Sequence, residues 1–404
     1  QKVKIMKYIV VLGDGMADRD IKELGNRTIL DVAKKPNIDG LKGITGMVKT
    51  VPNTLKPGSD VANLAVMGYN PLECYTGRSP LEAVSIGIKM KDSDVAIRCN
   101  LVTLSDEKDI SKRKMLDYSA GEISTEEAKK LIKAVEEGLG NSEFKFYPGI
   151  SYRHCLIWDK GRTVLNLTPP HDISGRVTGE YLPDNDKIFD LMERSYDILK
   201  NHPVNLKRIK EGKNPANSIW LWGEGTKPRI DNFYKKTGLK GAVISAVDLI
   251  KGIGISAGME SIDVEGATGT LDTNYEGKLE AAKNTLLKDG NDFVYIHLEG
   301  PDECGHHGDI EGKISAVERI DKNIVGPLCQ ALKGAGEDFA MLIMPDHPTP
   351  IETRTHSSDP VPFKIYRSND EKKSAEVYSE KNAGRSGIFI EDGYNLLTKF
   401  INND

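Results

Sequence analysis

The sequence has little that would indicate a membrane, a nucleic acid or a disulfide framework. Its 404 residues contain no run of about 18 apolar residues, so no segment is typical of a transmembrane helix. The net charge of −5 provides no overall positive field for nucleic acid or an anionic membrane. The 5 cysteines are odd in number and form no CxxC pair, which favours reduced thiols. We therefore expect a cytoplasmic protein without nucleic-acid or membrane partners.

Common nucleotide-binding motifs are also missing. There is no Walker A loop, and Gly252, Gly254 and Gly258 miss the dinucleotide-binding spacing by one residue. No internal repeat or low-complexity segment occurs, and the composition, 38% hydrophobic and 28% charged, is that of a globular protein. At about 150 residues per domain, the length allows two or three domains.

What the sequence does contain is a set of apolar runs that end in polar residues. The runs 8–12, 292–298 and 339–344 are typical of parallel strands buried on both faces. The residues that follow them are carboxylates and imidazoles: Asp14, Asp302, His306, Asp346, His347 and His356. A single Asp in such a place is usually a helix cap or a turn residue. Because ligands bind at the carboxyl ends of strands in open α/β sheets, the whole set instead predicts a site for two divalent cations.

Ser59 opens an expected amphipathic helix directly after the chain-breaking pair Pro57-Gly58. One interpretation is a plain N-cap, the commonest role for a serine in this position. A helix N-terminus also stabilises an anion, and an activated serine can become phosphorylated. With the predicted metal site nearby, we favour Ser59 as a nucleophile.

Between residues 98 and 230 the chain alternates short strands, helices and loops rich in proline and glycine. Since the metal-type residues lie on both sides, we predict a core domain of residues 1–97 and 231–404 interrupted by an inserted α+β domain, 98–230. The insertion contains cations near proline, glycine and aromatic residues, a setting that favours anion binding over solvated surface: Arg98, Arg153, His154, His171 and Arg176.

Several sequence blocks resemble one enzyme family. They include GDGMAD, PGSDVANLAVMGY, GRSPLEA, GATGTLDTNYEGK, PDECGHHGD and MPDHPTP, and they extend from Met6 to about Arg367. Together they are similar to the cofactor-independent phosphoglycerate mutases of the alkaline phosphatase superfamily, in the short form first known from archaea. The resemblance implies an α/β fold: an alkaline-phosphatase-like core with a mainly parallel sheet flanked by helices, plus a smaller inserted α+β lid domain.

The resemblance also implies roles for individual residues. One metal would be held by Asp302, His306 and His356, and the other by Asp14, Ser59, Asp346 and His347. Of the neighbours His306 and His307, we choose His306 because it lies four residues after Asp302 and so on the same helical face. The substrate's phosphate or carboxylate would be bound by Arg98, Arg153, His154, His171, Arg176 and Lys251. Ser59, Lys251 and Arg98 would be catalytic.

The implied reaction is the interconversion of 2-phosphoglycerate and 3-phosphoglycerate, in glycolysis or gluconeogenesis, through a phosphoserine and independently of 2,3-bisphosphoglycerate. The two divalent ions would be manganese, with magnesium, zinc or cobalt as alternatives. A metal-dependent phosphomonoesterase, or another sugar-phosphate mutase, would share every ligand. A metal-binding protein without activity would not need Ser59 among the ligands. The sequence makes no prediction of oligomeric state.

Overall fold

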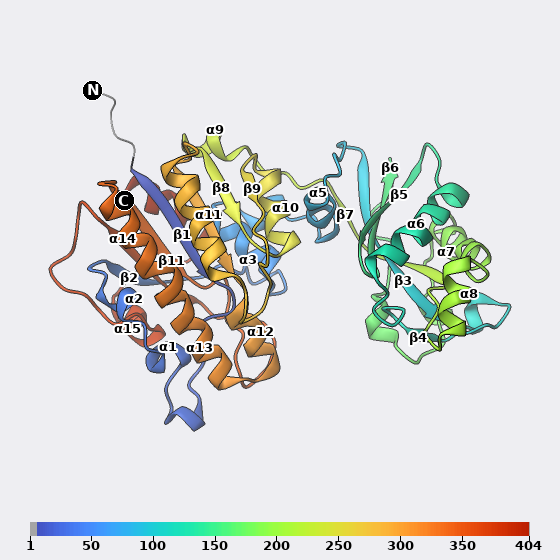
Figure 1. Cartoon of the computed structure of the whole chain (residues 1–404), viewed down its shortest axis with the longest axis horizontal. Helices are drawn as coiled ribbons and strands as arrows, with labels where there is room; N and C mark the ends of the chain where they lie inside the picture. Colours follow the sequence, from blue (N-terminus) through green and yellow to red (C-terminus); the bar gives the residue numbers. More distant parts are fainter. Residues whose placement is uncertain (1–5, 404) are drawn as a thin grey trace. The chain divides into compact units, whose positions relative to one another are not determined.

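The apolar runs form adjacent strands of one sheet in the computed structural model, which describes residues 6–403 (Figure 1). β1 (Lys7–Gly13) lies between β10 (Phe293–Leu298) and β11 (Phe339–Met344) and is parallel to both. All residues of β10 and β11 are buried, as expected for strands covered on both faces. The carboxyl ends of the three strands therefore meet at one edge of the sheet.

Over the described residues this sheet has 8 strands, in the order β13-β2-β12-β11-β1-β10-β8-β9. The strands not yet given are β2 (Ile44–Val48), β8 (Gly241–Ile244), β9 (Glu260–Ile262), β12 (Val361–Arg367) and β13 (Phe389–Ile390). β12 is antiparallel to both of its neighbours, and the other neighbouring pairs are parallel. The predicted α/β fold with a mainly parallel sheet is confirmed.

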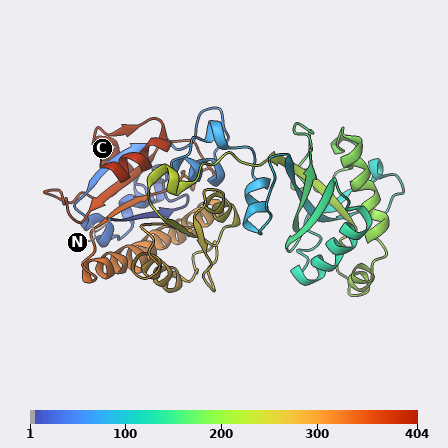
Figure 2. The ribbon, with the colours of Figure 1, turned by 90° about the horizontal axis from the view of Figure 1, so that it is seen from above.

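Helices cover both faces of the sheet (Figures 1 and 2). Successive strand residues point to opposite faces, so strands that are apolar at every position need cover on both sides. Ile9 and Val11 share a core with helices on one face: α1 (Ile29–Val32), α2 (Pro36–Gly40), α11 (Tyr275–Leu287), α13 (Ile310–Ile320) and α14 (Gly326–Gly334). Tyr8 points the other way, where its ring contacts Phe400 at 5.6 Å between centroids. Further helices in the part of the protein that contains this sheet are α3 (Ser59–Val66), α4 (Pro71–Cys74), α9 (Phe233–Thr237), α10 (Asp248–Ser256), α12 (Gly300–His307), α15 (Glu380–Arg385) and α16 (Leu396–Asn402).

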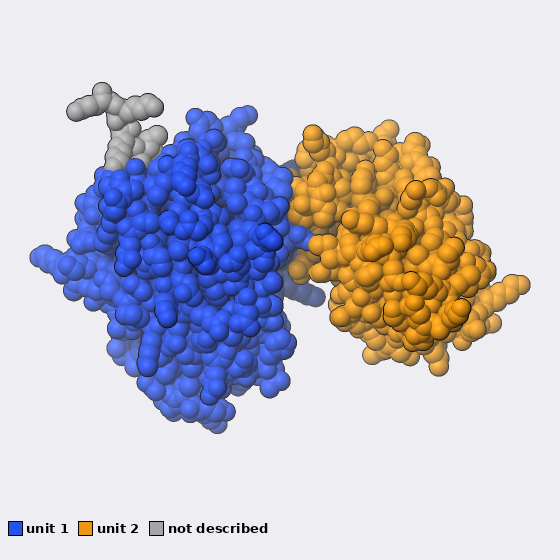
Figure 3. Space-filling model, viewed as in Figure 1, with its two compact units in different colours: residues 1–75, 229–404 blue, residues 76–228 orange. Residues whose placement is uncertain are grey.

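The second compact unit comprises residues 76–228, and the first comprises the described residues up to 75 and from 229 onward (Figure 3). The second unit contains an antiparallel sheet. The order of its strands is β4 (Met115–Asp117), β3 (Asp94–Leu104), β6 (Arg153–Asp159) and β5 (Phe144–Ile150), and β7 (Ser218–Thr226) also pairs with β3. Its helices are α5 (Ser79–Ser85), α6 (Thr125–Leu139), α7 (Asp186–Leu199) and α8 (Pro203–Lys210).

The second unit begins at Thr76, so the predicted boundary at Arg98 is wrong. Arg98 lies in the middle of β3, which pairs with both β6 and β7, so the chain has already entered this sheet. α5 also belongs to the unit because it packs on β3 and β7.

The remaining structural findings concern membranes and thiols. In the described part of the chain no helix has the length and apolar character needed to cross a bilayer. All 5 cysteines are free and buried.

Candidate functional site

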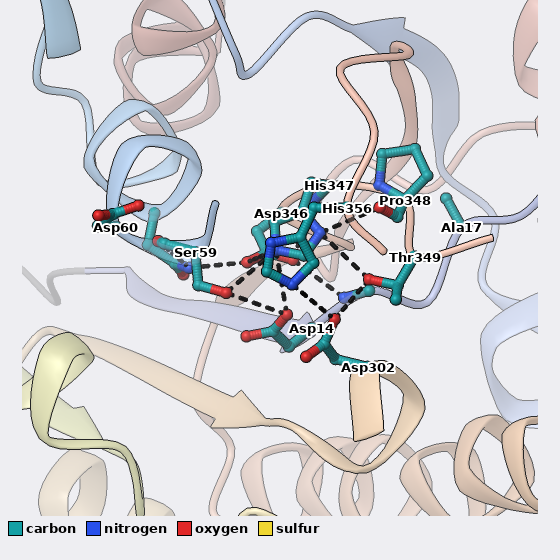
Figure 4. Close-up of polar contacts among 12 residues, drawn as sticks. Asp14, Ala17, Ser59, Asp60, Asp302, Asp346, His347, Pro348, Thr349 and His356 are labelled. Atoms are coloured by element: carbon teal, nitrogen blue, oxygen red, sulfur yellow. Dashed lines mark hydrogen bonds and ion pairs between the residues drawn. The ribbon is translucent and has the colours of Figure 1, made fainter. Parts of the chain in front are cut away.

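The predicted carboxylates and imidazoles of the first unit come together at the carboxyl ends of β1, β10 and β11 (Figure 4). Asp302, His347 and His356 each offer a ligand atom, and these atoms lie within 4.8 Å of one another. Asp14, Asp346 and His347 form a second group that meets the same limit. His347 belongs to both groups, so the two form one continuous cluster.

His306 lies at the more exposed side of this cluster. Its Nε2 is 3.2 Å from Asp302 Oδ2, four residues earlier on α12, and 3.0 Å from His356 Nε2. Burial would raise the pKa of Asp302, but hydrogen bonds with His306 and His356 hold it below its usual value. The hydrogen bond to Asp302 in turn raises the pKa of His306. Asp302, His306 and His356 thus converge on one point with one carboxylate and two imidazoles.

Ser59 is the first residue of α3, and Gly58 is the N-cap. The interpretation of Ser59 as the N-cap is therefore wrong. The Ser59 Oγ lies 3.0 Å from His347 Nε2 and 3.5 Å from Asp14 Oδ1 (Figure 4). This places a hydroxyl group at a helix N-terminus and directly beside the second group of donors.

The cluster buries negative charge without a buried lysine or arginine that contacts its carboxylates in the described residues. Asp14, Asp346 and Asp302 are 1%, 0% and 5% exposed. Burial, and next the charge of Asp346, raise the pKa of Asp14 well above its usual value. Burial also lowers the pKa of His347, so the ring of His347 is a poor source of compensating charge for Asp14 and Asp346. Divalent cations would remove this conflict, and the oxygen and imidazole donors fit them.

Three residues that hold the ligands were not singled out from the sequence. The Asn63 side-chain NH₂ donates to Asp346 Oδ2 at 2.9 Å and to the Ser59 carbonyl at 2.7 Å. The Tyr295 hydroxyl contacts Asn63 Oδ1, and the Thr349 hydroxyl contacts Asp302 Oδ1. Only the position of Asn63, one helical turn after Ser59, was a signal that the sequence offered.

Gly15 explains why a glycine follows Asp14. Its φ is +64°, and a Cβ there would lie 2.8 Å from the Asp302 backbone. Its N–H donates to Asp346 Oδ1 at 3.0 Å. The glycine therefore lets the loop that carries Asp14 approach α12, the helix that carries Asp302.

The predicted substrate-binding cations of the second unit do not all have the same setting. The Arg98 guanidinium lies 4.1 Å from the centre of the Trp222 ring and pairs with Glu82, with Nε 3.0 Å from Oε2. The His171 ring is 5.3 Å from Trp222. Arg153 lies 5.8 Å from a second aromatic ring, that of Tyr152. These cations are thus arranged around aromatic side chains.

Arg176 and Lys251 are each bound to a neighbour. Arg176 is exposed and donates to the Tyr181 hydroxyl at 3.2 Å. Lys251, in the first unit, forms a 2.8 Å ion pair with Asp263. Its helix, α10, packs against α3, the helix of Ser59.

His154 does not fit the anion-binding role that the resemblance implied. It is 6% exposed, and its Nδ1 accepts a hydrogen bond from the Gly149 N–H at 2.9 Å. Burial lowers its pKa to about 3, so the ring is neutral. In the sheet it pairs with Cys99, which is one residue out of phase with Arg98, so the two side chains point to opposite faces.

The fold and the donor set define an α/β protein with a buried carboxylate and imidazole cluster suited to divalent metal ions. A family model described as 2,3-bisphosphoglycerate-independent phosphoglycerate mutase matches residues 41–205. A relative from Geobacter sulfurreducens, named a probable enzyme of that kind, is 48% identical over 403 residues, which cover 98% of this chain and 100% of the relative. One from Methanosarcina barkeri, with the same name unqualified, is 50% identical over 402 residues, covering 97% and 98%. The chain belongs to the 2,3-bisphosphoglycerate-independent phosphoglycerate mutase family, as the sequence blocks predicted.

Solved structures share the fold along the whole chain. A protein from Pyrococcus horikoshii matches with a TM-score of 0.80 and 28% identity, covering 100% of this chain and 99% of the other. A cofactor-independent phosphoglycerate mutase from Thermoplasma acidophilum matches with a TM-score of 0.69 and 24% identity, covering 99% and 100%.

Proposed function

We propose that this enzyme interconverts 2-phosphoglycerate and 3-phosphoglycerate through a phosphoserine at Ser59, without 2,3-bisphosphoglycerate. The observation that carries the proposal is the position of the Ser59 Oγ, 3.0 Å from His347 Nε2 and 3.5 Å from Asp14 Oδ1, at the start of a helix. A metal-binding protein without activity would not need a hydroxyl group there. The names of the relatives support the choice of substrate.

The residues of the cluster would hold two divalent cations, for which manganese is our first choice. Asp302, His306 and His356 would hold one, and Asp14, Ser59, Asp346 and His347 the other. Once bound, the cations would supply positive charge that lowers the pKa of the Ser59 hydroxyl and stabilises the transferring phosphoryl oxygens. The conflict of buried carboxylates around Asp14 supports this assignment.

The protein's own residues would transfer the phosphoryl group and retain the glycerate. The Ser59 Oγ forms a bond to phosphorus while the bond from phosphorus to the substrate oxygen breaks. Glycerate stays bound, and the phosphoryl group returns to its other hydroxyl. Arg98, Arg153, His171 and Arg176, with Lys251 as a further cation, would bind the substrate's phosphate or carboxylate, because charge-assisted bonds from arginine suit both anions. The second unit would act as a lid that keeps water from the phosphoserine.

A phosphomonoesterase with the same ligands would differ in one respect, since it need not retain glycerate. The test is to add 3-phosphoglycerate and Mn²⁺, without bisphosphoglycerate, and to follow 2-phosphoglycerate and free phosphate in one reaction. We expect the unaltered enzyme to form the isomer faster than phosphate. Release of phosphate faster than isomer would make the protein a phosphatase.

Arginine variants sharpen this test. Arg98→Ala and Arg153→Ala should lower isomer formation much more than phosphate release. Glycerate is then held less well, but the metal ligands and Ser59 are unchanged, so water can still attack the phosphoserine. Arg194→Ala is the matched control, because Arg194 is 56% exposed and forms a surface pair with Asp190. An equal fall of both products in Arg98→Ala and Arg153→Ala would exclude these two from retaining glycerate.

A further inference from the structure

His297 connects the strands on either side of β10, at the level of the proposed metal centre. β10 lies between β1 and β8, and His297 pairs with Leu12 of β1. Its Nε2 is 2.7 Å from Asp14 Oδ2, just beyond the end of β1. Its Nδ1 is 3.1 Å from the Ser245 Oγ, just beyond the end of β8. The imidazole thus bridges Asp14 and Ser245 along the edge of the sheet.

The direction of these hydrogen bonds follows from the backbone N–H of Val247, which lies at the far end of the series from Asp14. The Val247 N–H can only donate, and it donates to the Ser245 Oγ at 3.0 Å. Ser245 is 3% exposed, so its single hydroxyl proton needs an acceptor, which His297 Nδ1 supplies. The ring proton is then on Nε2 and is donated to Asp14 Oδ2. In this arrangement the Val247 N–H, the Ser245 hydroxyl, both ring nitrogens of His297 and Asp14 Oδ2 each have a hydrogen-bond partner.

The consequence for Asp14 is that its two carboxylate oxygens have different surroundings. Oδ2 accepts the hydrogen bond from His297. Oδ1 faces the reacting side, 3.5 Å from the Ser59 Oγ and 3.4 Å from His347 Nε2. Asp14 and His297 are each 1% exposed, so water has little access to replace the imidazole.

We infer that His297 is a positioning residue that fixes the Asp14 carboxylate so that only Oδ1 is turned to a bound cation. The inference rests on the proposed function, where Asp14 is a metal ligand. Hydrogen-bond partners that orient metal ligands typically change metal affinity by roughly ten- to a hundredfold when they are removed. A role in folding alone would instead change stability and leave metal affinity as it is.

The chain offers a matched pair of variants at this position. In His297→Gln, the side-chain NH₂ can take the place of the Nε2–H and donate to Asp14. In His297→Asn, the shorter side chain places its Oδ1 near the Nδ1 position, where it can accept from Ser245, and Asp14 Oδ2 loses its donor. Ser245→Ala keeps the imidazole but removes the group that fixes its proton on Nε2.

The experiment is calorimetric titration of metal-free protein with MnCl₂, together with thermal unfolding of each variant without metal. We expect His297→Asn to weaken one Mn²⁺ site roughly ten- to a hundredfold. His297→Gln should recover most of that affinity, and Ser245→Ala should lose less than His297→Asn. Equal weakening by Asn and Gln, or parental affinity in His297→Asn whatever its thermal stability, would overturn the inference.

Three further outcomes are also decisive. If His297→Asn does not fold, Ser245→Ala decides, because weaker Mn²⁺ binding supports the positioning role and unchanged binding refutes it. If the unaltered protein binds no Mn²⁺, the proposed metal centre fails, and the role of His297 fails with it. If the unaltered protein binds Mn²⁺ and the variants bind equally well, only the positioning role fails.

Discussion

Ser59→Ala should separate catalysis from stability, because the structure gives this hydroxyl no part in capping its helix. Gly58 is the N-cap of α3, and the Ser59 Oγ contacts His347 and Asp14 instead. Removing it deletes about one hydrogen bond, so the free energy of unfolding without metal should fall by no more than about 1 kcal/mol. The nucleophile is lost entirely, and the rate should fall on the order of 10⁴-fold or more, about 5 kcal/mol of barrier.

Ser124→Ala is the matched control, since Ser124 is a serine that does cap a helix. Its side chain accepts a hydrogen bond from the Glu127 N–H at the start of α6. This variant should lose about 1 kcal/mol of stability and keep its activity. The two substitutions remove the same atom, but only Ser59→Ala should lose activity.

The assay combines a coupled measurement of turnover with mass spectrometry of enzyme quenched during reaction. We expect a phosphopeptide that contains Ser59 in the unaltered enzyme and none in Ser59→Ala. If Ser59→Ala kept a tenth of the rate, the nucleophile assignment would be wrong. A phosphate mapped to another residue would have the same meaning.

The remaining predictions concern metals and pH. Asp302→Asn should remove one Mn²⁺ per chain and lower the rate a hundredfold or more, on the order of 3 kcal/mol of barrier; full activity would exclude Asp302 as a ligand. Mn²⁺ at about a hundred times its Kd should stabilise the unaltered protein by about 2.7 kcal/mol per site over a chelator-treated sample, seen as a higher Tm. Burial raises the pKa of Glu380 to about 7 from 4.5, so stability should fall as pH rises between these values, by on the order of 3 kcal/mol. Glu380→Gln should remove that slope in urea unfolding, and an equal slope in both proteins would refute the assignment.

The positions of the metal-type residues could be predicted from the sequence because they depend on local signals. Each lies at or soon after the end of a short apolar run that is typical of a buried strand, and parallel strands bring their carboxyl ends to one edge. Asp302 and His306 needed only the helical spacing of four residues. These signals do not depend on the order of the strands in the sheet.

The residues that support the ligands could not be predicted in this way. His297 reaches Asp14 and Ser245 only because β10 lies between β1 and β8, and sequence periodicity does not give that order. The same reason applies to His154, whose burial depends on the phase of β6 against β3. The first boundary of the second unit, at Thr76, was missed because α5 belongs to that unit only through its packing on β3 and β7.

The three buried carboxylates share a feature that bears on how the site is prepared for metals. Each has a fixed partner within the protein: Asp14 is held by His297, Asp346 by Gly15 and Asn63, and Asp302 by Thr349 and His306. Such contacts restrict how each carboxylate can turn, so less ordering remains to be done when a cation binds. The same contacts keep like charges close together, which costs stability as long as no cation is present. We infer that the fold favours a prepared site over a stable metal-free state.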